Sequence, residues 1–446
     1  MSRKNSNTEK IAKNEKEITL KTNLPEEFQI QNNTLTIPSV YDHISLNKLV
    51  KKLVQSDEKT FNFFIDNKLL EKPLHNFLLE NPEVLKSSEE KSIEIFYSFK
   101  LEEPKLMNTI KEDEWVKKIS IRKNFNLKNE LEYYCVGLFN SELTFYNRSN
   151  EQLFKIKDNQ EDEMCEILHD LCFFSRENGD NIVLKSSRNE TENIKIFNVD
   201  LTKGTSNQIY KIGKQNLEYV NCLGVNPIDT NFFCAGDTSG SIKLYKIPSG
   251  EDKTQMSTNS SNANKNKKRK IEVSNLSCES TIEKCHENKE IVHINWLNNS
   301  QIVTYGDDFN LKIWNLNTKT NYMSMNTNHK YVSTLMKYGE DSIVTGHDDG
   351  RIKFWDLKSG KISNIFAGHS KFVSALDWNM GDESKFISCG YDSVLNMWDT
   401  RSNKAPLYSI KTDSEKNYGL AFNTFDYMMC GGDNANVNIY SNMQNN

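Results

Sequence analysis

Residues Gly368 to Arg401 read GHSKFVSALDWNMGDESKFISCGYDSVLNMWDTR, and this stretch decides the fold of the C-terminal part of the chain. After the Gly-His pair, three short apolar stretches alternate with polar turns, and the third ends at Trp398-Asp399. The pattern predicts three short strands joined by hairpin turns, with a fourth strand beyond the Trp-Asp pair. One sheet of this size cannot bury both faces alone, so copies of the unit are expected to pack beside it as the sheets of a propeller.

Two copies of the unit lie directly upstream. Asn328 to Gly360 reads NHKYVSTLMKYGEDSIVTGHDDGRIKFWDLKSG, and Cys285 to Thr318 reads CHENKEIVHINWLNNSQIVTYGDDFNLKIWNLNT. Each of the three units has a His near its start, a hydroxyl residue four places before a turn Asp, and a Trp six places after that Asp. The four positions are His286, Thr304, Asp308 and Trp314; His329, Thr345, Asp349 and Trp355; and His369, Ser388, Asp392 and Trp398.

This fixed spacing predicts a chain of hydrogen bonds within each unit. The Asp accepts from the His and from turn amides, the His contacts the hydroxyl, and the hydroxyl contacts the indole N–H. Such a network belongs inside a sheet only when every member has a partner. The spacing resembles the WD-repeat β-propeller family, in which these residues are structural. A metal or catalytic role for the histidines is the alternative, but no second ligand residue stands at a suitable spacing.

Length, charge and cysteine usage set the broad class of the protein. At 446 residues the chain is long for one ordinary core, so two domains or a repeat array are expected. The net charge of −5 is only mildly acidic, and the nine cysteines form no CxxC motif. Because no apolar run reaches membrane-spanning length and the N-terminus lacks a signal-peptide core, we expect a soluble, intracellular protein that binds no membrane. The cysteines are expected to be small buried hydrophobes in a reducing compartment.

The N-terminal region has a different pattern from the repeats. Residues 1–15 are polar and are expected to form a disordered tail. Residues 16–104 predict two strands, a helix capped by Ser45, two further strands with a short helical turn, and a last strand at Ile93 to Phe99. This order is that of a ubiquitin-like β-grasp domain. Because more chain follows it, the domain cannot be conjugated as a tag and is expected to act by being bound.

The stretch FNFFIDNKLLEKPLHNFLLENPEVLKSSEEKSIEIFYSFKLEEP, from Phe61 to Pro104, resembles the N-terminal ubiquitin-like domain of the Ytm and NLE group of ribosome assembly factors. In that group, a Glu in the loop before the last strand completes the coordination of a divalent ion held by the MIDAS domain of the AAA ATPase midasin. The resemblance assigns this role to Glu90, with Glu89 as a near alternative. A single exposed carboxylate suits Mg²⁺, which takes one or two carboxylates and keeps several waters. The other reading of Ser87 to Lys91 is a solvated loop.

The remaining chain is predicted to be all-β. Residues 105–114 are expected to be a linker, and residues 115–446 a seven-bladed propeller that needs no cofactor and no metal of its own. The first three blades lack most of the marker residues; in the third, Ser239 stands at the place of the turn Asp and Tyr245 at that of the Trp. The seventh blade stops after three strands. Its missing outer strand is expected from the segment around 105–114 or from the start of the first blade, because closing the ring removes an unpaired edge.

An insertion rich in Ser, Asn and Lys, residues 250–282, is expected between the third and fourth blades as a mobile loop. It contains a basic cluster, Lys265, Lys267, Lys268, Arg269 and Lys270. A dense, exposed cluster of this kind favours a nuclear-import signal. Contact with RNA phosphates and a merely solvated loop are the alternatives, and import and RNA contact are compatible with each other.

No motif for a nucleophile, a phosphate-binding loop or a zinc ligand set is present in the sequence, so the chain is interpreted as a scaffold and not an enzyme. The resemblance implies a nuclear, chiefly nucleolar and nucleoplasmic, factor for assembly of the large (60S) ribosomal subunit and pre-rRNA processing. The chain resembles the WD-repeat member of the PeBoW complex. This resemblance implies four partners: a propeller-bearing protein of the Bop/Erb type, a Pescadillo-type protein, midasin and the pre-60S particle. The alternatives are the sister factor of the NLE type, a ubiquitin-pathway substrate adaptor, and direct rRNA binding by a basic propeller face.

Overall fold

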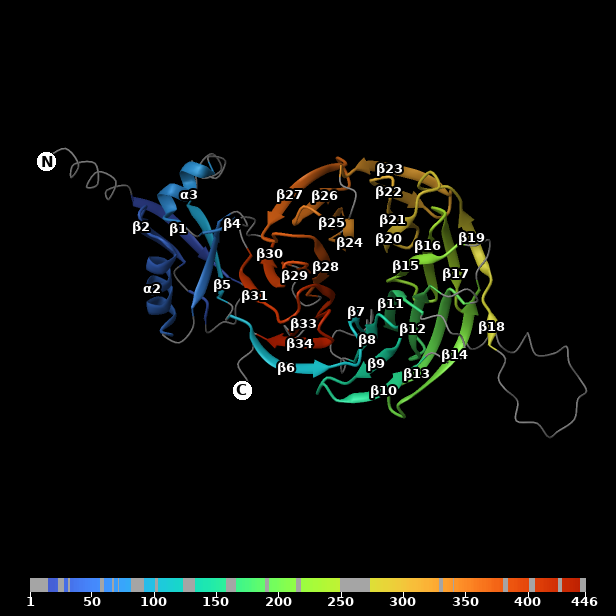
Figure 1. Ribbon diagram of the computed structural model, residues 1–446. Helices are drawn as coiled ribbons and strands as arrows, with labels where there is room; N and C mark the ends of the chain where they lie inside the picture. Colours follow the sequence, from blue (N-terminus) through green and yellow to red (C-terminus); the bar gives the residue numbers. More distant parts are fainter. Residues whose placement is uncertain are drawn as a thin grey trace, which may run out of the picture. The chain divides into compact units, whose positions relative to one another are not determined.

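The computed structural model describes most of the chain in two compact units, the first formed mainly by residues up to Glu103 and the second beginning at Pro104 (Figure 1). The described residues are 15–22, 28–30, 33–56, 60–65, 68–70, 72–81, 92–100, 103–122, 133–157, 166–188, 192–213, 218–248, 273–328, 332–339, 341–379, 384–400, 406–423 and 427–441. None of the helices in this part of the chain is both long and apolar enough to cross a membrane.

The first unit has the predicted ubiquitin-like arrangement. Its sheet has the strand order β2-β1-β5-β3-β4, and β1 runs parallel to β5 at the centre. A helix between the second and third strands packs its apolar side against the sheet, with Leu46 and Val50 fully buried. The elements are β1 (Glu15–Lys21), β2 (Thr34–Pro38), α2 (His43–Val54), β3 (Phe61–Ile65), β4 (Lys68–Leu69), α3 (Leu74–Glu80) and β5 (Ile93–Phe99).

Two local predictions for this unit need correction. Helix α2 is capped by Asp42 and not by Ser45, because the Asp42 carboxylate accepts the Ser45 backbone N–H at 2.9 Å. Ser45 therefore lies inside the first turn of the helix. Asp and Ser are similarly favoured at the N-cap position. The second strand begins at Thr34, whereas Phe28 and Ile30 pack against the core from outside that strand.

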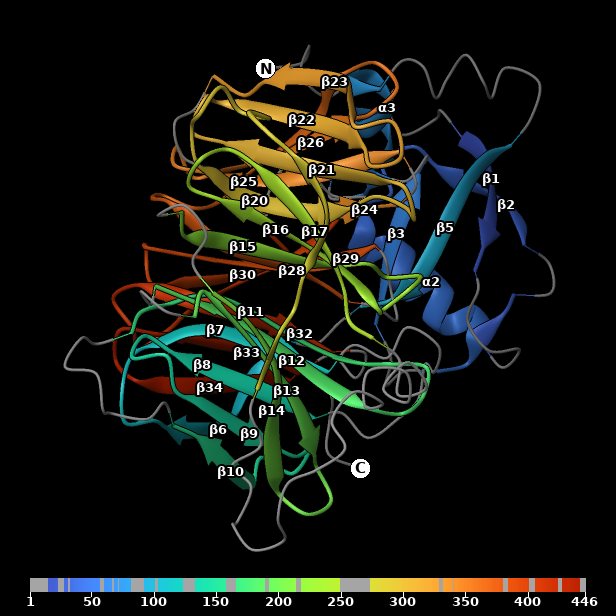
Figure 2. The same ribbon diagram turned by 90° about the vertical axis from the view of Figure 1, so that its right-hand side faces the viewer.

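The second unit is a ring of four-stranded antiparallel sheets, one of which carries a fifth, parallel strand, and this ring confirms the predicted propeller class. Among the described residues there are seven such sheets. The first strand of each sheet contacts the first strands of its two neighbours, and the contact between β32 and β7 joins the last sheet to the first. Figure 2 shows one such neighbour pair, with β15 and β16 beside β20 and β21. The apolar cores lie between successive sheets.

In each of the first three sheets, the strands follow one another in sequence order from the centre of the ring outward. The first sheet contains β7 (Val116–Ile121), β8 (Tyr134–Leu138), β9 (Leu143–Tyr146) and β10 (Gln152–Ile156). The second contains β11 (Leu168–Ser175), β12 (Asn181–Ser187), β13 (Ile194–Asp200), β14 (Thr205–Ile212) and, parallel to β14, β18 (Ser274–Asn275). The third contains β15 (Val220–Val225), β16 (Phe232–Asp237), β17 (Ile242–Lys246) and β19 (Cys278–Ile282).

The other four sheets follow the same plan. The fourth contains β20 (Ile291–Trp296), β21 (Gln301–Gly306), β22 (Asn310–Asn315) and β23 (Thr320–Asn326). The fifth contains β24 (Val332–Tyr338), β25 (Ser342–His347), β26 (Arg351–Asp356) and β27 (Lys361–Ala367). The sixth contains β28 (Val373–Trp378), β29 (Lys385–Gly390), β30 (Val394–Asp399) and β31 (Tyr408–Lys411). The seventh contains β32 (Asn417–Phe422), β33 (Tyr427–Gly432), β34 (Asn436–Ser441) and β6 (Lys105–Lys111).

The segment expected as a linker is the strand that closes the ring. β6 pairs antiparallel with β34, from Lys105 opposite Ser441 to Lys111 opposite Asn436 (Figure 1). Ile110 on β6 packs against the core that the first and seventh sheets share. The linker assignment of 105–114 is therefore wrong for residues 105–111, while the expectation that this region supplies the missing outer strand is confirmed. The free edge of β34 accounts for the pairing, because an unpaired edge leaves its backbone groups without partners.

The insertion lies in a different place from the one expected. Its sequence falls inside the third sheet, between β17 and the outer strand β19, and not between the third and fourth blades. The end of the predicted range 250–282 is also ordered, because Ser274 and Asn275 form β18 and Cys278 to Ile282 form β19. A pairing strand of only a few polar residues carries little hydrophobic signal, so composition alone did not mark it.

Candidate functional site

Two of the sequence-predicted sites lie outside the described residues. Glu89 and Glu90 belong to 82–91, between the end of α3 and the start of β5. The basic cluster, Lys265, Lys267, Lys268, Arg269 and Lys270, belongs to 249–272, between β17 and β18. The roles assigned to these residues stay predictions. The structure does describe the polar networks within the sheets and the surfaces at the two ends of the ring.

The fourth and sixth sheets contain the hydrogen-bond chain that the spacing predicts. In the sixth sheet, His369 Nδ1 lies 3.0 Å from Asp392 Oδ2 and His369 Nε2 lies 2.6 Å from Ser388 Oγ. The Trp398 indole N–H donates to the same hydroxyl at 2.8 Å. The fourth sheet repeats these contacts at 2.7, 2.7 and 3.1 Å, with the four residues His286, Asp308, Thr304 and Trp314.

In the fifth sheet, the described residues show part of the predicted chain of hydrogen bonds. Trp355 Nε1 donates to Thr345 Oγ1 at 2.8 Å, as in the other two sheets. The imidazole that contacts Thr345 is that of His347, at 2.7 Å from Nε2, and His329 lies outside the described residues. The Asp349 carboxylate accepts the Arg351 backbone N–H at 3.0 Å and lies in the turn, as predicted. A fully buried histidine on the second strand therefore completes the contact, and the spacing rule did not identify it.

The turn carboxylates predict how stability depends on pH. Burial raises the pKa of Asp392, but the hydrogen bond and charge of His369 and the amides of Ser370 and Val394 outweigh it, so the pKa lies below its usual 3.8. The pKa of Asp308 is lowered in the same way. A lowered folded-state pKa contributes stability that is present above the unfolded pKa and is lost as the pH falls through the folded value. We expect the melting temperature to fall below about pH 4, and to fall less steeply in Asp392→Asn. Thermal melts between pH 7 and 2.5 measure both slopes, and equal slopes would refute the assignment.

A lysine on the third strand of several sheets was missed by the sequence reasoning. Lys312 Nζ lies 2.7 Å from Asp308 Oδ2, Lys243 Nζ lies 3.0 Å from Asp237 Oδ2, and Lys195 Nζ lies 3.0 Å from Glu166 Oε1. Lys195 and Lys312 are nearly buried, so each cation needs the carboxylate as its partner. The signal was present in the sequence, as a Lys two places before the aromatic residue in IKIF, IKLY, LKIW and IKFW. In the third sheet, Ser239 stands at the position of the turn Asp and donates to the Asp237 carboxylate at 2.7 Å. The turn carboxylate of this sheet is therefore two positions earlier in the sequence than in the regular units.

The first sheet has a substitute network that joins it to the closing strand. Glu112, one residue after β6, accepts from Tyr146 OH at 2.8 Å and from Thr144 Oγ1 at 3.1 Å. Its side chain is almost fully buried, and this burial raises its pKa although the two hydroxyls and Lys155 act in the opposite direction. The network therefore ties the end of β6 to β9 in a sheet that lacks the His and Trp of the regular units.

Aromatic side chains form a continuous row at one end of the ring, which we call the aromatic row: Trp115, Phe139, Tyr418, Tyr391 and Phe372. Successive ring centroids lie 5.9, 5.1, 5.5 and 4.9 Å apart, and the row crosses the first, seventh and sixth sheets. Two ammonium groups lie over its rings, Lys117 at 4.9 Å from Phe139 and Lys416 at 5.6 Å from Tyr391. Trp115 remains 46% exposed. Tyr391 and Tyr418 are half-buried. Trp and Tyr are enriched among the residues that dominate protein interfaces.

Backbone hydrogen bonds hold the aromatic row in place. The Phe139 N–H donates to the Trp115 carbonyl at 3.0 Å, and the Tyr391 N–H donates to the Phe372 carbonyl at 2.9 Å. The row lies where first strands begin and second strands end, which is one end of every antiparallel sheet. Within the described residues, no cluster of three or more His, Cys, Asp or Glu could hold a metal ion. The aromatic row is therefore a candidate surface for contact with a partner.

The fold defines a class of protein: a WD-repeat propeller preceded by a ubiquitin-like unit. Comparison with family models gives the same division of the chain. Residues 17–78 match the NLE (NUC135) domain, and residues 360–399 match the WD domain, G-beta repeat.

The chain carries this NLE domain and WD repeat, and it has animal homologues with the name ribosome biogenesis protein WDR12 homolog. The protein of Anopheles gambiae is 24% identical over 259 residues, which cover 57% of this chain and 58% of the relative. That of Nematostella vectensis is 20% identical over 61% of this chain and 65% of the relative, and that of Trichoplax adhaerens 29% identical over 32% and 35%. The matches thus span between about a third and two thirds of the relatives' length.

A solved structure supports the fold of the second unit. The crystal structure of the WD40 beta propeller domain of Doa1 covers 76% of this chain and 98% of its own, with a TM-score of 0.56 and 14% sequence identity. At this identity the likeness concerns the fold alone. Function follows from the fold only through the sites it carries.

Proposed function

We propose that the protein is a non-enzymatic scaffold in the assembly of the large ribosomal subunit and in pre-rRNA processing. The observation that carries the proposal is the combination of an NLE domain and a WD repeat in one chain that is similar to ribosome biogenesis proteins. A ring of sheets with a rigid aromatic surface supports a role in binding partners. The protein would act in the nucleus, in the nucleolus and nucleoplasm, with the cluster from Lys265 to Lys270 as its import signal.

The proposal gives the two units separate partners. The propeller would bind a propeller-bearing partner of the Bop/Erb type, which in turn holds a Pescadillo-type protein, on the pre-60S particle. The ubiquitin-like unit would be bound by midasin, through a divalent ion completed by a carboxylate from this chain. Resemblance of Phe61 to Pro104 to the Ytm and NLE group supports this division, as does the described sheet order of the first unit.

Glu90→Ala is expected to weaken binding to the midasin MIDAS domain by roughly thirty-fold, or about 2 kcal/mol, because the metal loses one ligand from its partner. The variant should fold and enter pre-ribosomes as the wild type does. Binding to the isolated MIDAS domain with Mg²⁺, and again with EDTA, measures the effect. Glu89→Ala tests the near alternative ligand, and equal binding by wild type and both variants in Mg²⁺ would remove the midasin proposal.

Trp115→Ala combined with Tyr391→Ala is expected to lower affinity for the Bop/Erb-type partner at least about tenfold, because interface energy concentrates in a few aromatic anchors. Ile228→Ala is the control, since Ile228 is 59% exposed and lies between β15 and β16, at the other end of the sheets. Calorimetry with the purified partner measures both. If the control weakens binding and the pair does not, the partner docks on the opposite end of the ring.

The sister factor of the NLE type is the second candidate from the sequence. That group carries an eighth blade, whereas the described residues of this chain form seven sheets that close on themselves through β32 and β7. An eighth sheet would have to stand between β32 and β7, which contact each other directly. This geometry supports the Ytm-type proposal over the NLE-type one.

A further inference from the structure

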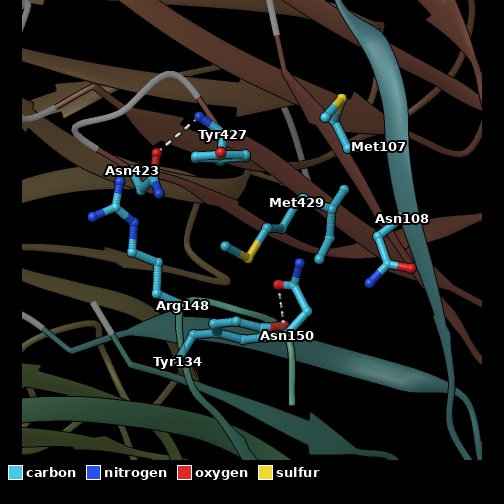
Figure 3. Close-up of a pocket in the computed structure, with 9 residues that line it drawn as sticks. Met107, Asn108, Tyr134, Arg148, Asn150, Asn423, Tyr427 and Met429 are labelled. Carbon is cyan, nitrogen blue, oxygen red and sulfur yellow. Dashed lines mark hydrogen bonds between the residues drawn. The ribbon is translucent and has the colours of Figure 1, made fainter. Parts of the chain in front are cut away.

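A pocket of about 250 Å³ opens at the junction of the first and seventh sheets, at the end of the ring opposite to the aromatic row. Its lining residues come from β6, from the start of β8, from the β9–β10 turn and from β33 and β34. Figure 3 shows Met429 at its centre, Tyr134 below it, and Arg148 and Asn423 together on one side. The volume lies below the roughly 300–1,000 Å³ of sites for drug-sized ligands, so it suits one side chain better than a whole cofactor.

The floor of the pocket is apolar and buried. Tyr134, Met429 and Ile439 are each at most 5% exposed and belong to the core shared by the two sheets. The Tyr134 hydroxyl donates to Asn150 Oδ1 at 2.9 Å, so the ring and the turn residue are fixed relative to each other (Figure 3). An inserted apolar side chain would therefore find a preformed surface, which lowers the ordering cost of binding.

The rim of the pocket presents hydrogen-bond donors. Each of its three asparagines uses its amide oxygen internally: Asn108 accepts the Thr109 N–H at 2.9 Å, Asn150 accepts from Tyr134, and Asn423 accepts the Tyr427 N–H at 2.8 Å. Because the Thr109 N–H and the Tyr134 hydroxyl donate to the amide oxygens of Asn108 and Asn150, the NH₂ groups of these two residues are left as donors. Within the described residues, the NH₂ groups of Asn108 and Asn150 have no partner of their own. Arg148 adds a guanidinium, and no described carboxylate lines the pocket.

We propose that this pocket binds an acidic peptide segment that inserts one apolar side chain. The apolar floor would bury the inserted side chain, and the asparagine donors and Arg148 would bind carboxylate and carbonyl oxygens on either side of it. A peptide fits better than RNA, because RNA needs several cations for its phosphates and Arg148 is the one cationic residue among the described lining residues. The site is independent of the aromatic row and is not part of the proposed partner assignments.

The site also bridges the strand that closes the ring to the first and last sheets. Asn108 lies on β6, Ile439 on β34 and Tyr134 on β8, so an occupant would contact all three. A ligand that binds only the closed ring stabilises it by mass action. Binding is therefore expected to raise the melting temperature of the propeller, which gives a readout besides affinity.

The test uses the full-length protein and fluorescent nine-residue peptides, Gly-Ser-Glu-Asp-X-Asp-Glu-Ser-Gly, in which X is Leu, Met, Phe or Gly. A second set has Lys in place of every acidic residue, and a ten-nucleotide oligouridylate is the RNA probe. Arg148→Glu tests the rim, and Lys358→Glu is the charge-matched control, because Lys358 is highly exposed and belongs to the fifth sheet. Anisotropy titration and thermal melts are recorded for each pair.

The proposal predicts dissociation constants below roughly 0.1 mM for the acidic peptides with an apolar X. Affinity should fall at least about tenfold with X as Gly, with the lysine peptides and with Arg148→Glu, and should be unchanged in Lys358→Glu. It is overturned if no acidic peptide binds below 1 mM, if RNA binds in their place, or if Arg148→Glu binds as the wild type does. None of these outcomes involves pre-ribosomes, so a failure here is distinct from a failure of the proposed function.

Discussion

Replacement of residues 105–111 by seven residues of Gly, Ser and Pro is expected to abolish folding of the propeller. The change removes the strand that pairs with β34 along its length and takes Ile110 out of the core shared by the first and seventh sheets. Domains are stable by only about 5–15 kcal/mol, and a lost strand together with an opened core exceeds a large part of that margin. Soluble yield and the far-ultraviolet thermal melt measure the loss.

A second replacement tests whether the propeller needs β6 as a paired strand or needs its particular side chains. Leu106→Thr, Met107→Thr and Ile110→Val together keep the alternation and the backbone donors of β6, and both Leu106 and Met107 are exposed. This control is expected to melt close to the wild type, since β-branched residues suit a paired edge. A Gly-Ser-Pro variant that is soluble and melts as the wild type does would show that the ring does not depend on β6.

Ser388→Ala is expected to lower the free energy of unfolding of the propeller by about 2–4 kcal/mol. The substitution removes the hydroxyl that contacts both His369 Nε2 and the Trp398 indole N–H, and all three groups are fully buried or nearly so. Each buried polar group left without a partner costs about 1–3 kcal/mol. Urea denaturation followed by tryptophan fluorescence measures the change in the midpoint.

The matched control for this prediction is present in the chain itself. Thr304 and Thr345 occupy the corresponding positions of the fourth and fifth sheets, where each accepts from an indole N–H. Ser388→Thr should therefore keep most of the stability that Ser388→Ala loses. If the Ala variant is as stable as the Thr variant, the network does not hold the sheet together.

The regular sheets were predictable from sequence because a geometric requirement repeats at a fixed offset. Trp314 bonds to Thr304 directly and Asp308 is linked to Thr304 through His286. The same spacing and the same contacts recur in the sixth sheet. The core cysteines followed from the same strand pattern: Cys135, Cys234, Cys389 and Cys430 are fully buried, as expected for small hydrophobes before turns.

What was missed depends on pairing between distant segments, which periodicity does not report. β6 is polar enough to resemble a linker, and only the free edge of β34 makes it a strand. His347 contacts Thr345 from two positions further along the same strand, and Glu112 accepts a hydrogen bond from Tyr146 across the closure. In both cases a nearby side chain satisfies a buried group, and the sequence contains no offset that specifies which one.

The predicted binding residues stay predictions, because the structure does not describe them. Glu89, Glu90 and the cluster from Lys265 to Lys270 rest on resemblance and composition, and they lie outside the described residues. The aromatic row was absent from the sequence reasoning, since its rings come from turns of three sheets that meet only when the ring closes. A pattern search within one repeat has no access to such a surface.

The central claim, that this chain serves in assembly of the large ribosomal subunit, is tested most directly by what it binds in the nucleus. A tagged full-length chain is purified from nuclear extract, separated on a density gradient, and its companions are identified by mass spectrometry and RNA sequencing. The account predicts sedimentation with pre-60S particles that contain large-subunit pre-rRNA and the Bop/Erb-type and Pescadillo-type proteins. Recovery with a ubiquitin ligase or the proteasome, and absence from every pre-ribosomal fraction, would contradict it.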